Sequence, residues 1–219
     1  MTSPAELVRA HTVLARPFLV PELELHLATH ECALWRATEE DLARVGLPEP
    51  YWAFTWAGGE ALARHVLDHP ATVRGRRVLS FGAGSGVEAI AAARSGAARV
   101  VANDVDPVAC AAVALNAAHN GVEVETVATD LVGALDLGVD LVLCGDSTYS
   151  TELARRLRAW FLALADAGVE VLIADPGRGY LDPDGMEVVA VHQAPADIDM
   201  DGSNLLRTAI YRVRPRKPG

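Results

Sequence analysis

Val78-Leu79-Ser80-Phe81-Gly82-Ala83-Gly84-Ser85-Gly86 is the stretch of sequence that decides the fold. An apolar run of strand length leads directly into three closely spaced glycines. A strand that ends in glycines and opens a helix is typical of a ligand-binding βα unit, because glycine lets the backbone approach a ligand closely. Val87 stands where the dinucleotide fingerprint requires its third glycine. The spacing therefore favours a ligand other than a pyrophosphate, and a tight turn without a ligand is the simpler alternative.

The residues after this turn alternate between strand and helix patterns. Strands are expected at 78–81, 99–103, 122–128, 139–144 and 169–174, and helices at 87–95, 107–120 and 151–166. Apolar strands joined by helices predict an α/β fold with an open, mostly parallel sheet that is covered on both faces. The last two candidate strands, 186–192 and 205–213, have no obvious helix between them. We therefore expect them to pair as an antiparallel hairpin at the far edge of the sheet.

The residues before the turn are mixed in pattern. We interpret residues 1–75 as an N-terminal extension and residues 76–219 as the core domain. A helix is expected at 4–15, and the alternation of leucine with polar residues at 23–27 predicts a half-buried strand. Three further elements are expected: a short helix at 39–45, an aromatic turn at 50–59 and a helix at 59–68.

The composition is that of a globular protein with one main core. The 219 residues are 51% hydrophobic and 22% charged. No apolar run is long enough to span a membrane, and the N-terminus lacks the apolar stretch of a secretory signal. The net charge of −10 argues against a general nucleic-acid binder, whose surface must be positive.

The cysteines and histidines predict neither a disulfide framework nor a metal site. Cys32, Cys110 and Cys144 are far apart and odd in number, which favours the reducing cytoplasm as the location. The seven histidines show no ligand spacing.

Acidic residues follow the second and third expected strands. Asp104 lies about 20 residues after Gly82, where an acid usually accepts hydrogen bonds from ribose hydroxyls. Asp106, two residues later, is better interpreted as a helix N-cap. Asp130 suits a hydrogen bond to an adenine amino group, and a role in a turn fits it equally well.

Asp146 and Tyr149 follow the fourth expected strand, whose carboxyl end should lie beside the glycine turn. Their side chains can face one pocket, and an Asp-initiated turn before the next helix is an equal alternative. Three aromatic residues of the 50–59 segment either close such a pocket or fill the core. They are Tyr51, Trp52 and Trp56.

Together these motifs resemble the class I, S-adenosylmethionine-dependent methyltransferases. The resemblance is closest to the seven-strand protein-lysine methyltransferases that act on the electron transfer flavoprotein β subunit, and it covers roughly residues 17–213. Besides the glycine turn it rests on PELEL at 21–25, PYWAFTWAGG at 50–59, ANDVDP at 102–107, GDSTY at 145–149 and DPGR at 175–178. It implies a Rossmann-like seven-strand sheet, S-adenosyl-L-methionine as cofactor, and methylation of lysine side chains on a protein substrate such as that subunit.

The resemblance also implies a role for each matched residue. The expected cofactor-binding residues are Trp56, Ser80, Gly82, Gly84, Gly86, Asp104 for ribose and Asp130 near adenine. Asp146 and Tyr149 match the family's D-x-x-Y motif, which positions the target lysine. Relatives usually carry aspartate at position 80, where it helps to hold the amino group of the cofactor. Ser80 keeps a hydroxyl there but brings no charge.

Other functions are compatible with the same motifs. The alternatives are methylation of a ribosomal protein, methylation of a small amine, and a cofactor-binding scaffold without catalysis, which Ser80 favours. A nucleic-acid methyltransferase is disfavoured because the Asn/Asp-Pro-Pro-Tyr/Phe motif for flipped bases is absent. An acidic rim around the pocket would attract a surface that carries lysine.

Overall fold

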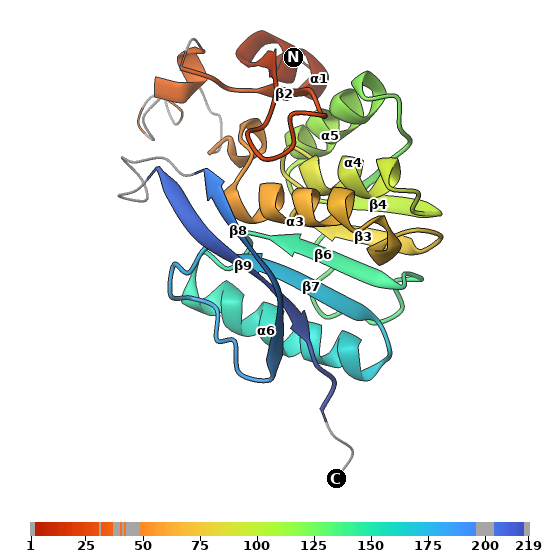
Figure 1. The fold of residues 1–219 in the computed structure, drawn as a ribbon. Coiled ribbons are helices and arrows are strands. Elements are labelled where there is room, and N and C mark those ends of the chain that lie inside the picture. The colour runs from red at the N-terminus through yellow and green to blue at the C-terminus, as the bar shows by residue number, and fades with distance from the viewer. Residues whose placement is uncertain are drawn as a thin grey trace.

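A seven-stranded sheet runs through the molecule, with helices on both faces (Figure 1). The computed structural model describes residues 3–30, 32–36, 40, 42, 49–195 and 204–216. The strands of the sheet are β3 (Arg77–Phe81), β4 (Arg99–Asn103), β5 (Glu125–Val127), β6 (Leu141–Gly145), β7 (Glu170–Asp175), β8 (Met186–Pro195) and β9 (Leu205–Val213). They lie in the order β5-β4-β3-β6-β7-β9-β8.

The pairing of these strands confirms the predicted fold class. All neighbours from β5 to β7 are parallel, whereas β9 is antiparallel to both β7 and β8. The hairpin that ends the chain therefore forms the far edge of the sheet, with β9 inserted between β7 and β8. This arrangement places the carboxyl ends of β3, β4 and β6 next to one another, since β3 pairs with both of the other strands.

Two layers of helices bury the sheet. The helices α3 (Ala57–Asp68), α4 (Val87–Arg94) and α5 (Pro107–His119) cover one face, and α6 (Thr151–Asp166) covers the other (Figure 1). Because strand side chains alternate between faces, consecutive residues of one strand enter different cores. Val78 packs in the core beneath α3 and α4, and Leu79 packs in the core against α6. None of the helices in the described part of the chain is long and apolar enough to cross a membrane.

The N-terminal residues form small elements beside α5. They are α1 (Pro4–His11), β1 (Val13–Ala15), β2 (Leu25–Leu27) and the 3₁₀ turns η1 (Ala33–Arg36), η2 (Tyr51–Ala53) and, before β3, η3 (Pro70–Thr72). β1 and β2 pair as a separate antiparallel sheet. The Asn116 side chain on α5 accepts a hydrogen bond from the His26 backbone N–H at 2.7 Å, which ties β2 to the core. The domain boundary at residue 75 stays a prediction.

Three sequence-based boundaries are corrected by this structure. The helix expected at 4–15 ends at His11, because Val13 to Ala15 pair with Leu27 to Leu25 as a strand. The strand expected at 122–128 is only Glu125–Val127, the three residues that pair with β4. The strand expected at 23–27 likewise shortens to Leu25–Leu27. Most of the helix expected at 39–45 lies outside the described residues.

Candidate active site

The glycine turn joins β3 to α4 with a backbone that only glycine adopts freely. Gly82, Gly84 and Gly86 have φ angles of 63°, 50° and 82°, a left-handed conformation that strains residues with a Cβ. A Cβ at Gly82 would lie 2.5 Å from the Ser147 hydroxyl oxygen. Any side chain at position 82 would therefore collide with Ser147, and glycine lets the turn pack closely against the residues that follow β6.

Asp104 stands at the end of β4 and braces the glycine turn. One of its carboxylate oxygens accepts a hydrogen bond from the Gly84 N–H at 2.9 Å, and the other accepts from the Asp106 N–H at 3.0 Å. Burial raises the pKa of the Asp104 carboxyl, and the backbone donors oppose this shift. The Asp106 side chain instead accepts from the Val108 N–H at 2.8 Å and caps α5, which confirms its predicted capping role.

Asp130 has an exposed side chain in the turn that follows β5. Its carboxylate accepts from the Val132 N–H at 2.9 Å and pairs with Arg156 at 3.2 Å. These contacts match the role in a turn, which was one of the two interpretations of Asp130 from the sequence. The contact with adenine stays a prediction.

Asp146 follows β6 in a conformation rare for residues with a side chain, with a φ of 50°. One carboxylate oxygen accepts hydrogen bonds from the N–H groups of Gly58 and Gly59 in the first turn of α3. The other accepts from Arg178 at 2.7 Å, and the Asp146 side chain is only 7% exposed. Burial raises the pKa of Asp146, while Arg178 and the two glycine N–H groups oppose that shift.

The backbone fits tightly around this contact. A Cβ at Gly58 would lie 2.7 Å from the Ala174 carbonyl oxygen, and one at Gly145 would lie 2.6 Å from the Gly59 nitrogen. Both distances are far below van der Waals contact, so glycine is required at positions 58 and 145. The D-x-x-Y motif at 146–149 and the glycines of the 50–59 segment therefore depend on each other.

Aromatic side chains and a cation surround Asp146. The Arg178 guanidinium lies 5.8 Å from the centre of the Trp56 ring, within the range of a cation–π interaction. Tyr51 contacts both Trp56 and Tyr149, with ring centres 5.9 and 6.1 Å apart. A chain of contacts through Arg178 and Tyr51 thus links Asp146 with Trp56 and Tyr149, and one pocket formed by Asp146 and Tyr149 stays a prediction. Arg178 joins them from the DPGR segment, and sequence reasoning assigned it no role.

Trp52 differs from its aromatic neighbours. It is 6% exposed and packs with Val8 and Ala109, so it fills the core between the N-terminal elements and α5. Tyr51 is 51% exposed, which leaves it available at the rim beside Tyr149. The two interpretations of the aromatic segment therefore apply to different residues within it.

Ser80 contacts a buried acid that sequence reasoning missed. The Ser80 hydroxyl donates a hydrogen bond to Glu88 Oε1 at 3.1 Å, and both residues are almost completely inaccessible to solvent. Burial raises the pKa of Glu88 to about 8, with the carboxylates of Asp146 and Asp104 adding to the shift. The available signal was one acid inside the otherwise apolar first turns of the helix that follows the glycines.

Glu88 makes folding stability depend on pH. Its pKa of about 8 in the folded protein exceeds the value of about 4.3 for glutamate in an unfolded chain. Between these values only the folded state holds the proton, so stability falls as pH rises and levels off above about 8. We expect a contribution of up to about 1.4 kcal/mol per pH unit.

Urea unfolding of wild type and Glu88→Gln at several pH values from 5 to 8 measures this contribution. The difference in unfolding free energy between the two proteins should move steadily in favour of the glutamine variant as pH rises. Parallel stability curves would contradict the prediction.

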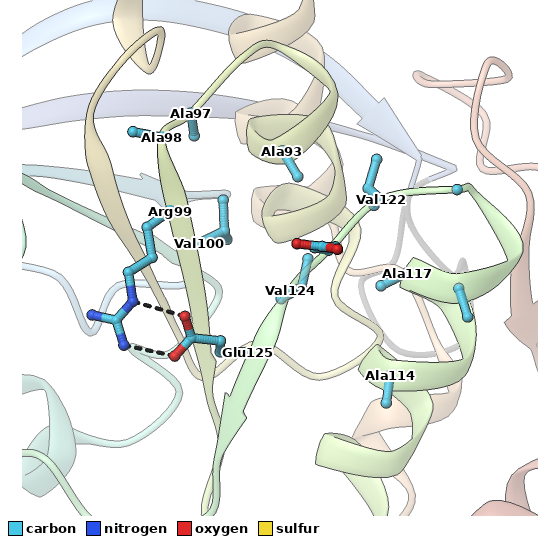
Figure 2. Close-up of a pocket in the computed structure, with 13 residues that line it drawn as sticks. Ala93, Ala97, Ala98, Arg99, Val100, Ala114, Ala117, Val122, Val124 and Glu125 are labelled. Carbon is cyan, nitrogen blue, oxygen red and sulfur yellow. Dashed lines mark hydrogen bonds and ion pairs between the residues drawn. The ribbon is translucent and has the colours of Figure 1, made fainter.

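A cavity lies elsewhere, at the opposite end of the sheet. It has a volume of about 600 Å³ and is lined mainly by alanine and valine side chains between the ends of α4 and α5 (Figure 2). Arg99 and Glu125, which start β4 and β5, form an ion pair at its mouth. Because the glycine turn and Asp104 follow the carboxyl ends of their strands, this cavity is separate from the candidate site. In the described ranges, no group of three or more potential ligand side chains is placed to hold a metal ion.

Comparison with known proteins identifies the family. Electron transfer flavoprotein beta subunit lysine methyltransferase from Danio rerio is 38% identical over 200 residues, which cover 89% of this chain and 76% of that relative. The Xenopus laevis relative of the same name is 42% identical over 179 residues, which cover 81% and 72%. This chain belongs to the electron transfer flavoprotein beta subunit lysine methyltransferase family. Residues 62–145 also match the family described as ribosomal protein L11 methyltransferase (PrmA).

Solved structures support the methyltransferase fold. A ribosomal protein L11 methylase from Lactobacillus delbrueckii subsp. bulgaricus matches 74% of this chain and 81% of its own, with a TM-score of 0.52 and 21% identity. The T. Thermophilus 16S rRNA N2 G1207 methyltransferase RsmC, in complex with AdoMet and guanosine, matches 94% of this chain and 50% of its own, with a TM-score of 0.59 and 15% identity.

The methyltransferase uses S-adenosylmethionine, as the sequence predicted. The carboxyl ends of β3 and β4 fit this cofactor, since Gly82, Gly84 and Gly86 expose the backbone of the turn and Asp104 is held beside it. The roles of the individual residues stay predictions.

Proposed function

We propose that this methyltransferase transfers a methyl group to lysine side chains of an electron transfer flavoprotein β subunit. The observation that carries the proposal is the identity of 38% to the Danio rerio relative over 89% of the chain, which extends far beyond the cofactor-binding half. The rim of Tyr51, Trp56 and Tyr149 around Asp146 supports it. Aromatic walls beside a carboxylate suit the apolar stem and cationic head of a lysine.

The cofactor is assigned to the carboxyl ends of β3 and β4. The backbone can approach the methionine and ribose parts of the cofactor closely at Gly82, Gly84 and Gly86. Asp104 accepts hydrogen bonds from the ribose hydroxyls. Trp56 and Ser80 line the same site, and Asp130 stands near adenine. The bound cofactor supplies an electrophilic methyl group on a sulfonium.

Asp146 and Tyr149 are assigned to the lysine. The Asp146 carboxylate attracts the ammonium and orients it, and Tyr149 contributes a wall and a hydroxyl. Arg178 already pairs with Asp146 at 2.7 Å, so an arriving lysine shares that carboxylate with Arg178 or displaces it. The carboxylate raises the pKa of the amine, whereas burial against aromatic rings lowers it, and the proton leaves to water.

The proposal also covers the cellular location of the enzyme and the class of its partner. The described cysteines Cys32, Cys110 and Cys144 are all free thiols, which supports action in the cytoplasm. The net charge of −10 supports a lysine-bearing protein as partner and not a nucleic acid.

Methyl transfer to candidate proteins tests the proposal. Purified enzyme with radiolabelled S-adenosylmethionine should label an electron transfer flavoprotein β subunit, and mass spectrometry should locate the label on lysine. Ribosomal protein L11 is the matched comparison substrate, because residues 62–145 match the family of its methyltransferases. Labelling of L11 or of free amines alone would overturn the proposed substrate, and binding of the cofactor without labelling of any lysate protein would favour a scaffold.

A further inference from the structure

Glu88 is a buried carboxyl group that the assigned roles leave unexplained. It lies in the first turn of α4 and is 2% exposed. One oxygen accepts from the Ser80 hydroxyl at 3.1 Å, and the other would lie 3.3 Å from a Cβ at Gly59. In the described ranges, no basic side chain forms an ion pair with it. A carboxyl group placed so deeply is costly to ionise unless a cation joins it.

The neighbours of Glu88 do not supply that cation. Asp146 and Asp104 are acids whose charges act on Glu88, and Asp146 is already paired with Arg178. Ser80 offers one neutral hydroxyl. The surroundings of Glu88 beside the glycine turn are therefore acidic, and they suit a positive group from outside the chain.

The position of Glu88 relative to Ser80 indicates which group this is. The family resemblance implies an aspartate at position 80 in relatives, and the oxygens of an aspartate extend one bond beyond the place of a serine hydroxyl. Glu88 Oε1 lies 3.1 Å from that hydroxyl, on its donating side. Glu88 on α4 thus places a carboxyl group near the position where an aspartate at the end of β3 would place one.

We propose that Glu88 is a cofactor-binding residue that, together with Ser80, holds the α-amino group of S-adenosylmethionine. The ammonium form of that group pairs with the Glu88 carboxylate, while the Ser80 hydroxyl fixes the orientation of the carboxylate. This assignment removes the main reason to regard the protein as a scaffold with an impaired cofactor site. It depends on the cofactor only and not on the proposed lysine substrate.

Calorimetric binding of two ligands tests the proposal without measuring methyl transfer. S-adenosylhomocysteine carries the α-amino group, and its deaminated analogue has hydrogen in that place. Glu88→Gln should weaken binding of S-adenosylhomocysteine at least about tenfold, because a charge-assisted hydrogen bond is lost. The same variant should change binding of the deaminated analogue by less than about threefold.

A swapped pair and a second buried acid serve as controls. The double variant Ser80→Asp, Glu88→Ser moves the carboxylate to β3 and should restore binding of S-adenosylhomocysteine to within about threefold of wild type. Glu60 on α3 is a comparably buried acid whose oxygens accept from the Leu19 N–H at 2.8 Å and the Thr55 hydroxyl at 2.6 Å. Glu60→Gln should leave the ratio of the two ligand affinities unchanged.

Two results would overturn the proposal. One is an equal decrease in affinity for both ligands in Glu88→Gln, which would show that Glu88 has only a structural role. The other is unchanged binding of S-adenosylhomocysteine in a folded Glu88→Gln variant. If Glu88→Gln fails to fold, the double variant Ser80→Asp, Glu88→Ser decides alone. The proposal is also contradicted if this double variant folds and binds the deaminated analogue but no longer prefers S-adenosylhomocysteine. Failure of lysine labelling with normal binding would instead affect only the proposed function.

Discussion

Replacing Asp104 with alanine is expected to weaken S-adenosylmethionine binding at least about a hundredfold. The carboxylate is assigned to the ribose hydroxyls, and hydrogen bonds to a charged group contribute about 1.5–3 kcal/mol each. The loss of two such bonds therefore exceeds the roughly 2.7 kcal/mol that corresponds to a hundredfold change in affinity. Asp104 also fixes the Gly84 N–H at 2.9 Å, so the alanine variant additionally loosens the glycine turn that receives the ligand.

Isothermal titration of the folded variant measures this loss, and Asp106→Ala is its matched control. The Asp106 side chain caps α5 through the Val108 N–H. Removing a helix cap costs about 1 kcal/mol of stability, so Asp106→Ala should unfold at lower temperature while binding the cofactor almost normally. Equal binding losses in the two variants would show that Asp104 acts on the fold and not on the ligand.

The contrast between these two aspartates also shows what the sequence was able to predict. A residue directly before Pro107 at the start of a helix is a cap by local geometry, and the strand that precedes Asp104 sets which edge of the sheet it reaches. Both inferences need only a few neighbouring residues. The glycine turn and the antiparallel hairpin at the far edge were predicted on the same basis, whereas the roles of Asp146, Tyr149 and Trp56 came through the family resemblance and stay predictions.

The contacts that sequence reasoning missed join residues of different secondary-structure elements. Arg178 reaches Asp146 from the end of β7, and Glu88 reaches Ser80 across the whole glycine turn. The single acid in the apolar first turns of α4 was a local signal for Glu88, but no local pattern identifies its partner or the pair of Arg178 with Asp146, because both contacts depend on tertiary packing. The end of the helix predicted at 4–15 was wrong for a related reason. Pairing of Val13 to Ala15 with β2 outweighed the helical pattern that continues through Ala15. Tertiary contacts routinely override local propensity in this way.

Replacing Asp146 with asparagine is expected to lower the rate of methyl transfer at least about a hundredfold, while cofactor affinity changes by less than about threefold. Asparagine keeps nearly the same shape but loses the charge that attracts the lysine ammonium. It also removes the charge that pairs with Arg178 in a largely enclosed site, and breaking a buried pair costs about 3–5 kcal/mol. Arg178 is 26% exposed, so part of that cost is relieved by solvent, and the variant should fold with reduced stability.

Single-turnover methylation, calorimetry and thermal unfolding together separate these effects, and Arg178→Ala is the informative partner variant. That change frees one Asp146 oxygen but keeps the hydrogen bonds from Gly58 and Gly59. If Asp146 orients the lysine directly, Arg178→Ala retains substantial transfer, because the carboxylate remains in place and a competing cation is gone. If Asp146 acts only by holding Arg178, both variants lose transfer to the same extent. The second pattern would withdraw Asp146 from the substrate site, and Arg178 would then be the side chain beside Trp56 that meets the incoming protein.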